Sequence, residues 1–295
     1  MMRIFYPLIL MLLVATVAAA QPAEPPMEAL VLSDGDSGTQ WTIAEATMAP
    51  DDTHARSGQA MRFHIDVNHE TGQPDYPIGW PRTYTNVPEG ERDWRAWDFV
   101  DFWVYAETSR EALPSSPVGF IVRCPDKANS LSTTLAEVRK DEWTHVRMAT
   151  ADLPNPADCT AVQFYISESN YDHGDVVDFW IDDLALLRYA EPTIISATPL
   201  TRVHYADVSV LRVRVELTGM DEGASAEVLT KLICNDSPVR QSSARLGPGV
   251  HTIPLDVGAN TPAGDYEVQT QIVGSDRTLN EPVRIVSSPW EAEAQ

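Results

Sequence analysis

The sequence is poor in cysteine and in basic residues, and it has only one long hydrophobic run. Its 295 residues include three cysteines, and 21 Lys and Arg stand against 43 Asp and Glu, for a formal net charge of −22. No Cys or His spacing matches a zinc site, and so negative a chain is a poor partner for nucleic acid or anionic lipid. Hydrophobic residues still make up 43% of the chain, which is enough for a folded core.

Catalytic signatures are also missing. The sequence contains no Gly-x-Ser-x-Gly elbow, no His-Glu-x-x-His pair and no phosphate-binding glycine loop. A jelly-roll polysaccharide lyase needs a Tyr/His pair with Arg and Gln or Asn on one strand face, and no His is interleaved with the plausible strand Gln163-Phe164-Tyr165. A glycosidase needs two carboxylates, for which Glu168 and Asp172 are the pair to test. We therefore assign no catalytic residue and keep a lyase or hydrolase as the second alternative.

The N-terminus has the pattern of a secretory signal peptide. Arg3 supplies the positive charge, residues 5–17 the apolar stretch, and Ala18-Ala19-Ala20 the small-residue cleavage site before Gln21. The apolar stretch is shorter than the roughly 20 residues that a membrane span requires. We expect residues 1–20 to be removed, residues 21–27 to form a Pro-rich linker, and the protein to be secreted, periplasmic or in the cell envelope.

The rest of the chain predicts an all-β protein. The run from Asp98 to Ala106 consists mostly of Val, Phe, Trp and Tyr, which is typical of a buried central strand. With its neighbours it makes about eight short strands, which suit a two-sheet jelly roll over 28–190. Similar spacing after Glu191-Pro192 predicts a smaller immunoglobulin-like β-sandwich over 191–288, followed by a tail over 289–295.

Several motifs of the first region resemble the galactose-binding-like β-jelly-roll carbohydrate-binding modules. These motifs are Asp34-Gly35-Asp36 with Trp41, Ser57-Gly58 before Met61-Arg62-Phe63, residues 97–104, Trp143-Thr144-His145-Val146 and residues 179–184. The resemblance covers about residues 28–189 and implies glycan binding together with a structural calcium, for which Asp182 is a ligand. The second region resembles the small β-sandwiches that accompany such modules in polysaccharide-degrading proteins.

Four aspartates are the candidate metal ligands. In a jelly roll the first and last strands can lie side by side, which would bring Asp34 or Asp36 close to Asp182 or Asp183. Paired buried carboxylates require a positive charge between them, and hard oxygen ligands suit Ca²⁺. We expect such a calcium to stabilise the fold rather than to catalyse. The alternative is that these side chains cap turns and face water.

Aromatic residues gather between residues 68 and 92, in a stretch that is too long for a simple connector. Sugars lay C–H patches on aromatic rings, and their hydroxyls bond to polar side chains nearby. Prolines on both sides of Ile78-Gly79-Trp80 favour a displayed segment. The candidate glycan-binding residues are Tyr76, Trp80, Arg82, Tyr84, Trp94 and, in a second loop, Tyr171. A place in the core is the alternative for Trp80, Tyr84 and Trp94.

Together these features predict an exported protein that binds a polysaccharide or glycan without catalysis. The first alternative is an envelope or secreted structural module that binds another protein, with the second region as the docking unit. Export would permit a disulfide between Cys124 and Cys159, which would leave Cys234 as a free thiol. Three unpaired buried thiols are the alternative, because spacing alone does not bring two Cβ atoms together.

Overall fold

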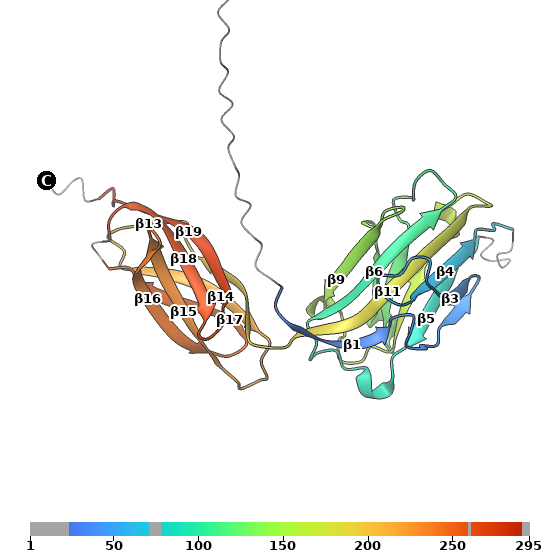
Figure 1. The fold of residues 1–295 in the computed structure, drawn as a ribbon, viewed down its shortest axis with the longest axis horizontal. Helices are drawn as coiled ribbons and strands as arrows, with labels where there is room; N and C mark the ends of the chain where they lie inside the picture. The colour runs from blue at the N-terminus through green and yellow to red at the C-terminus, as the bar shows by residue number, and fades with distance from the viewer. Residues whose placement is uncertain (1–23, 71–77, 259–260, 291–295) are drawn as a thin grey trace, which may run out of the picture.

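The structure is a computed structural model that describes residues 24–70, 78–258 and 261–290. The predicted signal peptide and Tyr76 lie outside the described residues. The chain forms two β bodies that lie end to end and are joined by the stretch after residue 189 (Figure 1). Among the described residues, no helix has the length and hydropathy needed to span a membrane.

The first body consists of two antiparallel sheets. One has the strand order β3-β4-β11-β6-β9, with β1 also pairing with β11, and the other has the order β2-β5-β10-β7-β8. The strands are β1 (Met27–Ser33), β2 (Thr42–Ala44), β3 (Thr47–Asp51), β4 (Ala60–Asp66), β5 (Arg82–Asn86), β6 (Phe99–Thr108), β7 (Gly119–Arg123), β8 (Leu131–Thr134), β9 (Trp143–Ala149), β10 (Ala161–Tyr165) and β11 (Val176–Tyr189). The loops of this body contain the short 3₁₀ helices η1 (Glu89–Glu91), η2 (Lys127–Asn129), η3 (Thr150–Asp152) and η4 (Glu168–Asn170).

Strand β6 lies inside its sheet, between β11 and β9, as its apolar composition predicts. Its alternate side chains point into the space between the two sheets, where Phe102 packs against Phe120 of β7 and Phe164 of β10. The three ring centroids are 4.8 to 5.3 Å apart. Because all three are fully buried, truncating any one to Ala would cost about 3–5 kcal/mol of unfolding free energy.

The second body is also made of two sheets around its own core. Their strand orders are β12-β14-β17 and β13-β19-β18-β15-β16. The strands are β12 (Thr193–Pro199), β13 (Val203–Tyr205), β14 (Val210–Thr218), β15 (Ala226–Cys234), β16 (Ser237–Leu246), β17 (Gly249–Asp256), β18 (Gly264–Ile272) and β19 (Thr278–Val286). Valine and leucine side chains at every second position fill the core, as on β14 with Leu211, Val213, Val215 and Leu217. The all-β prediction is confirmed.

One carboxylate connects the two bodies. Asp98, just before β6, accepts the Tyr189 N–H at 2.9 Å and the Thr218 hydroxyl at 3.0 Å. Tyr189 ends β11 of the first body, and Thr218 ends β14 of the second. The contact therefore joins the last strand of the first body to the end of β14 in the second.

Candidate functional site

The outer face of the sheet β2-β5-β10-β7-β8 carries a group of accessible aromatic side chains. Strand alternation produces this face: Val162 and Phe164 of β10 are buried in the core, and Gln163 and Tyr165 lie on the other side of the sheet. Tyr165 is half-buried there, and Gln163 is covered by its neighbours. Gln163 pairs with Tyr84 of β5, and Tyr165 pairs with Arg82. We call Trp80, Arg82, Tyr84, Arg123, Gln163 and Tyr165 the ring face.

Trp80 is the most exposed ring of this group. It is 43% exposed, and it meets the Tyr165 ring edge-on, with centroids 5.5 Å apart. The Arg82 guanidinium lies 4.7 Å from the Trp80 ring centroid and donates a 3.0 Å hydrogen bond to the Trp80 carbonyl. The indole is therefore oriented by two neighbours and still open to a ligand.

Two carboxylates hold the backbone under Trp80. Glu45 accepts the Trp80 N–H at 2.6 Å, and the buried Glu168 accepts the Gly79 N–H at 2.8 Å and the Asn68 N–H at 3.1 Å. A Cβ at Gly79 would lie 2.5 Å from the Glu168 carboxylate, so a glycine is required for this close approach. Glu168 thus positions the segment.

The other half of the ring face is built around Tyr84. The Arg123 guanidinium lies 4.3 Å from the Tyr84 ring centroid and donates to the Gln163 side-chain oxygen. The Gln163 amide nitrogen is buried and has no hydrogen-bond partner among the described residues. An unpaired buried donor is unfavourable, so this amide favours an arrangement in which an acceptor reaches it.

Two predicted site residues are in the interior, which corrects the sequence-based assignment. Trp94 is fully buried, and its indole N–H donates to the Glu91 carbonyl at 3.0 Å. Tyr171 is 3% exposed, its hydroxyl donates to the Pro117 carbonyl at 2.7 Å, and burial raises its pKa. Neither ring is available to a ligand in the described structure.

Three members of the ring face, Arg123, Gln163 and Tyr165, were not predicted as binding residues. The alternation of residues along 119–123 and 161–165 could have identified them. A period of two places every second side chain on the sheet face that points away from the core. The ring face has no histidine, so it lacks the Tyr/His pair that a lyase needs. Of the two carboxylates considered for glycoside cleavage, Glu168 bonds to backbone amides and Asp172 is paired with Arg110 at 3.5 Å.

Two of the four predicted metal ligands, Asp182 and Asp36, accept hydrogen bonds from the backbone of one turn, residues 56–59. Asp182 is fully buried, and its oxygens accept the Arg56 N–H at 2.8 Å and the Asp183 N–H at 2.9 Å. Burial raises the pKa of the Asp182 carboxyl, and these hydrogen bonds only partly offset the effect. Asp36 accepts the Gln59 N–H at 3.1 Å on the other side of the turn.

The two remaining aspartates do not bond to the backbone of this turn. Asp34 accepts the N–H groups of Asp36 and Ser37, and the Asp183 carboxylate lies 3.6 Å from the Arg56 guanidinium. Within residues 24–70, 78–258 and 261–290, no group of three or more His, Cys, Asp or Glu side chains is arranged to hold a metal. The donor chemistry of Asp182 and Asp36 fits calcium only if backbone oxygens supply most of the ligands.

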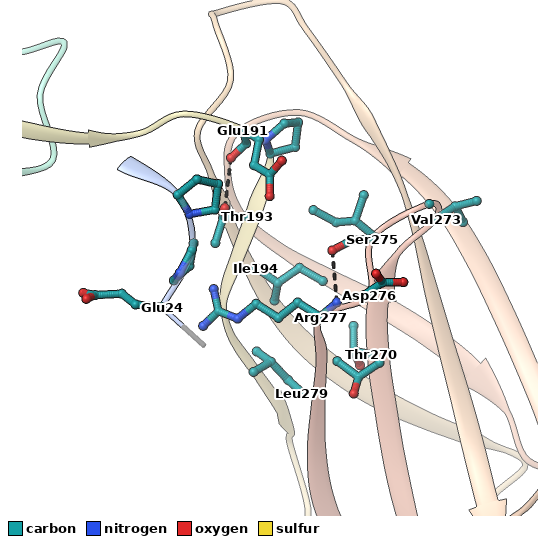
Figure 2. A pocket seen from close by; sticks show the side chains of 16 residues that line it. Glu24, Glu191, Thr193, Ile194, Thr270, Val273, Ser275, Asp276, Arg277 and Leu279 are labelled. Carbon is teal, nitrogen blue, oxygen red and sulfur yellow. Dashed lines mark hydrogen bonds between the residues drawn. The ribbon is translucent and has the colours of Figure 1, made fainter. Parts of the chain in front are cut away.

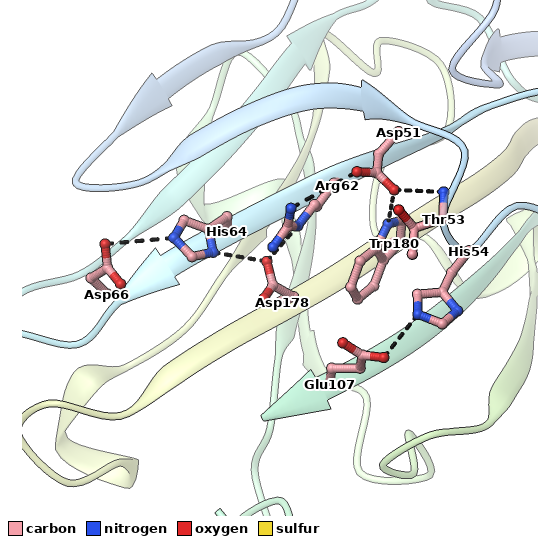
Figure 3. Close-up of polar contacts among 9 residues, drawn as sticks. All are labelled: Asp51, Thr53, His54, Arg62, His64, Asp66, Glu107, Asp178 and Trp180. Atoms are coloured by element: carbon pink, nitrogen blue, oxygen red, sulfur yellow. Dashed lines mark hydrogen bonds and ion pairs between the residues drawn. The ribbon is translucent and has the colours of Figure 1, made fainter. Parts of the chain in front are cut away.

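The opposite sheet of the first body carries a second polar cluster, which is closed (Figure 3). Asp178 accepts a 2.7 Å hydrogen bond from Arg62 and lies 2.8 Å from the His64 ring nitrogen. The Trp180 indole is 2% exposed and donates to Asp51 at 2.9 Å. Burial would raise the pKa of Asp51, but hydrogen bonds from Trp180 and Thr53 outweigh it and lower the pKa. Because these groups satisfy one another, the cluster offers no open ring.

No protein-family model matches this chain, and no curated protein matches it. A β-1,2-glucanase from Parabacteroides distasonis is a similar solved structure, with 11% identity, a TM-score of 0.40, and coverage of 91% of this chain and 40% of its own. CBM27-1 of Caldicellulosiruptor saccharolyticus, in complex with mannohexaose, has 14% identity, a TM-score of 0.29, and coverage of 54% and 97%. The adhesin domain of Epf from Streptococcus pyogenes has 11% identity, a TM-score of 0.26, and coverage of 88% and 87%.

These similarities concern β folds, and the chain spans 40% of the length of the glucanase. The solved structures with such folds include a carbohydrate-binding module and a glycoside-cleaving enzyme. At TM-scores of this size they carry no argument about function. That argument depends on the ring face.

Proposed function

We propose that this protein is an exported, non-catalytic glycan-binding protein and that the ring face is its binding site. The observation that supports this most is the pair of adjacent rings, Trp80 and Tyr165, which lies beside the Arg82 guanidinium on an outer sheet face. Sugar rings present flat C–H patches that stack on aromatic rings, and their hydroxyls accept hydrogen bonds from guanidinium and amide groups. The signal-peptide pattern at residues 1–20 supports export.

Preorganisation is the second support for this function. Glu45 and Glu168 fix the backbone at residues 79–80, and Arg123 is held between Tyr84 and Gln163. A ligand that docks on side chains already held in place loses less conformational entropy on binding. The long side chains of the ring face are thus restrained before a sugar arrives.

Affinity electrophoresis in gels that contain single polysaccharides tests the proposal. We expect slower migration with at least one neutral or acidic polysaccharide, and a substitution of Trp80 should remove the retardation. If no polysaccharide retards the protein, in calcium or in EDTA, the ring face does not bind glycans. Assays for reducing ends and for unsaturated products on the same polysaccharides check that binding occurs without cleavage.

We also propose a structural calcium at the turn formed by residues 56–59, with Asp182 and Asp36 as its carboxylate ligands. The support is the buried Asp182 carboxylate, which has no cationic side chain as a partner among the described residues. Bound calcium would neutralise this charge and link strand β11 to the turn, which would stabilise the folded state. Melting temperatures in calcium and in EDTA measure this effect.

A further inference from the structure

A hollow of about 760 Å³ lies where the two bodies meet, far from the ring face in sequence (Figure 2). Three segments line it: residues 24–26, residues 191–194 and the stretch from Thr270 to Leu279. The aliphatic side chains of Ile194 and Leu279 form part of its wall. Its volume is in the range of small-molecule binding pockets.

Arg277 reaches into this hollow and forms no ion pair with any described residue. Its Nε and Nη1 atoms are buried and have no hydrogen-bond partner in the part of the chain that the structure describes. Figure 2 shows the guanidinium reaching across the hollow toward the segment that carries Glu24. A guanidinium is always charged, and leaving it desolvated without an acceptor is costly.

Thr270 is a second unsatisfied group in the same hollow. It is 1% exposed, and its hydroxyl has no hydrogen-bond partner among the described residues. A buried hydroxyl and two buried guanidinium nitrogens without acceptors are the polar groups that an incoming oxyanion would satisfy. The two observations are independent, since one concerns a side chain of β18 and the other a residue just before β19.

The acidic side chains around the hollow do not neutralise Arg277. Glu24 accepts a hydrogen bond from Arg147 of the first body. Figure 2 shows the carboxylates of Glu24 and Asp276 turned away from the guanidinium. Glu191 uses its carbonyl to accept the Thr193 hydroxyl at 2.9 Å, and its carboxylate forms no ion pair among the described residues. Among the described residues, Arg277 therefore forms no ion pair, although the net charge of the chain is −22.

We infer that this hollow is an oxyanion-binding site in which Arg277 is the anchor. A planar guanidinium matches a carboxylate or a phosphate through two parallel N–H bonds. The shared chemistry is an oxyanion of small-molecule size, which a uronic acid or free phosphate would supply. The inference does not rest on glycan binding by the ring face, because no residue of the ring face lines the hollow.

Titration of the full-length protein with sodium glucuronate and with sodium phosphate tests this site. Sodium chloride at equal ionic strength and neutral glucose are the controls, and the readouts are the melting temperature and the NMR signal of the Arg277 Nε–H group. We expect a saturable shift of both readouts with at least one oxyanion. R277M should weaken that binding at least tenfold, and it should melt no lower than the unliganded wild type because it removes an unpaired charge.

Two further variants make the test specific. R202M removes an exposed arginine of the same body, paired with Glu281 at 3.8 Å, and should leave oxyanion binding unchanged. If R277M fails to fold, R277K keeps the charge without the planar fork and should fold and bind more weakly. A response to glucuronate alone identifies a carboxylate ligand, and a response to phosphate alone identifies a phosphate. The inference is overturned if neither anion gives a saturable response, or if both Arg277 variants respond like the wild type.

Discussion

The ring of Tyr165 lies directly over Gly119, its partner on the neighbouring strand β7. A Cβ atom at Gly119 would be 2.2 Å from Cε1 and Cζ of that ring. The missing side chain lets the phenol lie against the sheet with Trp80 at its edge. One glycine therefore shapes the ring face.

Replacing Gly119 by Val should displace the Tyr165 ring and weaken glycan binding about tenfold. The cost in unfolding free energy should stay within about 1 kcal/mol, because the ring sits at the outer surface and can move aside. Binding isotherms and urea unfolding measure the two effects. The control is Gly90→Ala in η1, where nothing lies within 4 Å of an added Cβ, and it should change neither quantity. Unchanged binding by G119V would show that the position of Tyr165 is irrelevant to the ligand.

Trp80→Ala should weaken glycan binding by about 2 kcal/mol, roughly 30-fold in Kd. The indole is 43% exposed and its backbone contacts to Glu45 and Arg82 do not use the ring, so stability should change by less than about 0.5 kcal/mol. Isothermal titration and thermal melting provide the two numbers. Trp290→Ala, which removes a 73% exposed indole from the second body, is the control and should bind like the wild type. A large fall in the melting temperature of W80A would instead place Trp80 among the structural residues.

Without calcium, the buried Asp182 carboxyl should make the folded state less stable as the pH rises, and bound calcium should remove this loss. Burial raises its pKa in the folded state above the ordinary value of 3.8. Its stabilising contribution is therefore fully present below pH 3.8 and is lost as the pH rises through the higher folded-state pKa. In EDTA, the melting temperature of the wild type relative to D182N should fall as the pH rises through this window.

Calcium should restore the melting temperature of the wild type at pH values above the folded-state pKa of Asp182, because the metal binds the ionised carboxylate. D182N should show little response to calcium. Wild-type protein whose melting curve is the same in calcium and in EDTA at neutral pH would exclude the structural site. The difference between the two proteins is the quantity to follow, since other carboxyls also titrate over this range.

Cys124 and Cys159 should form a disulfide when the protein folds in a glutathione redox buffer. Both thiols are buried and lie within 3.5 and 3.6 Å of the same Asn155 carbonyl oxygen. Burial raises the pKa of Cys159 to about 12, so its thiol reacts slowly in the folded state and the bond should form during folding. We expect a stabilisation of about 3–4 kcal/mol.

Mass spectrometry after alkylation under denaturing conditions counts the remaining thiols. The oxidised wild type should retain one free thiol, Cys234, while C234S should retain none. C124S and C159S should each leave both remaining cysteines open to alkylation. Three alkylated thiols in wild-type protein refolded in the redox buffer would mean that the two sulfurs do not pair.

The fold class followed from local patterns. Alternation of apolar and polar residues, the run of aromatic and β-branched residues in β6 and the turn residues between strands all depend on near neighbours in the chain. The same local signals predicted that Trp80, Arg82 and Tyr84 lie together, because they are within five positions of one another, and the structure places all three on the ring face. For residues that are far apart in the chain, the sequence indicated only which residue types a site requires, and not which of them meet in space.

Which aromatic rings face water was decided by the tertiary structure. Trp94 and Tyr171 lie in polar loops like those of a binding site, yet carbonyl groups at Glu91 and Pro117 satisfy their donors and the core covers their rings. Tyr165 instead lies on the outer face of the sheet, with its ring directly over Gly119, which is distant in sequence. Alternation along one strand depends only on that strand, whereas the exposure of a side chain depends on which distant segments pack beside it.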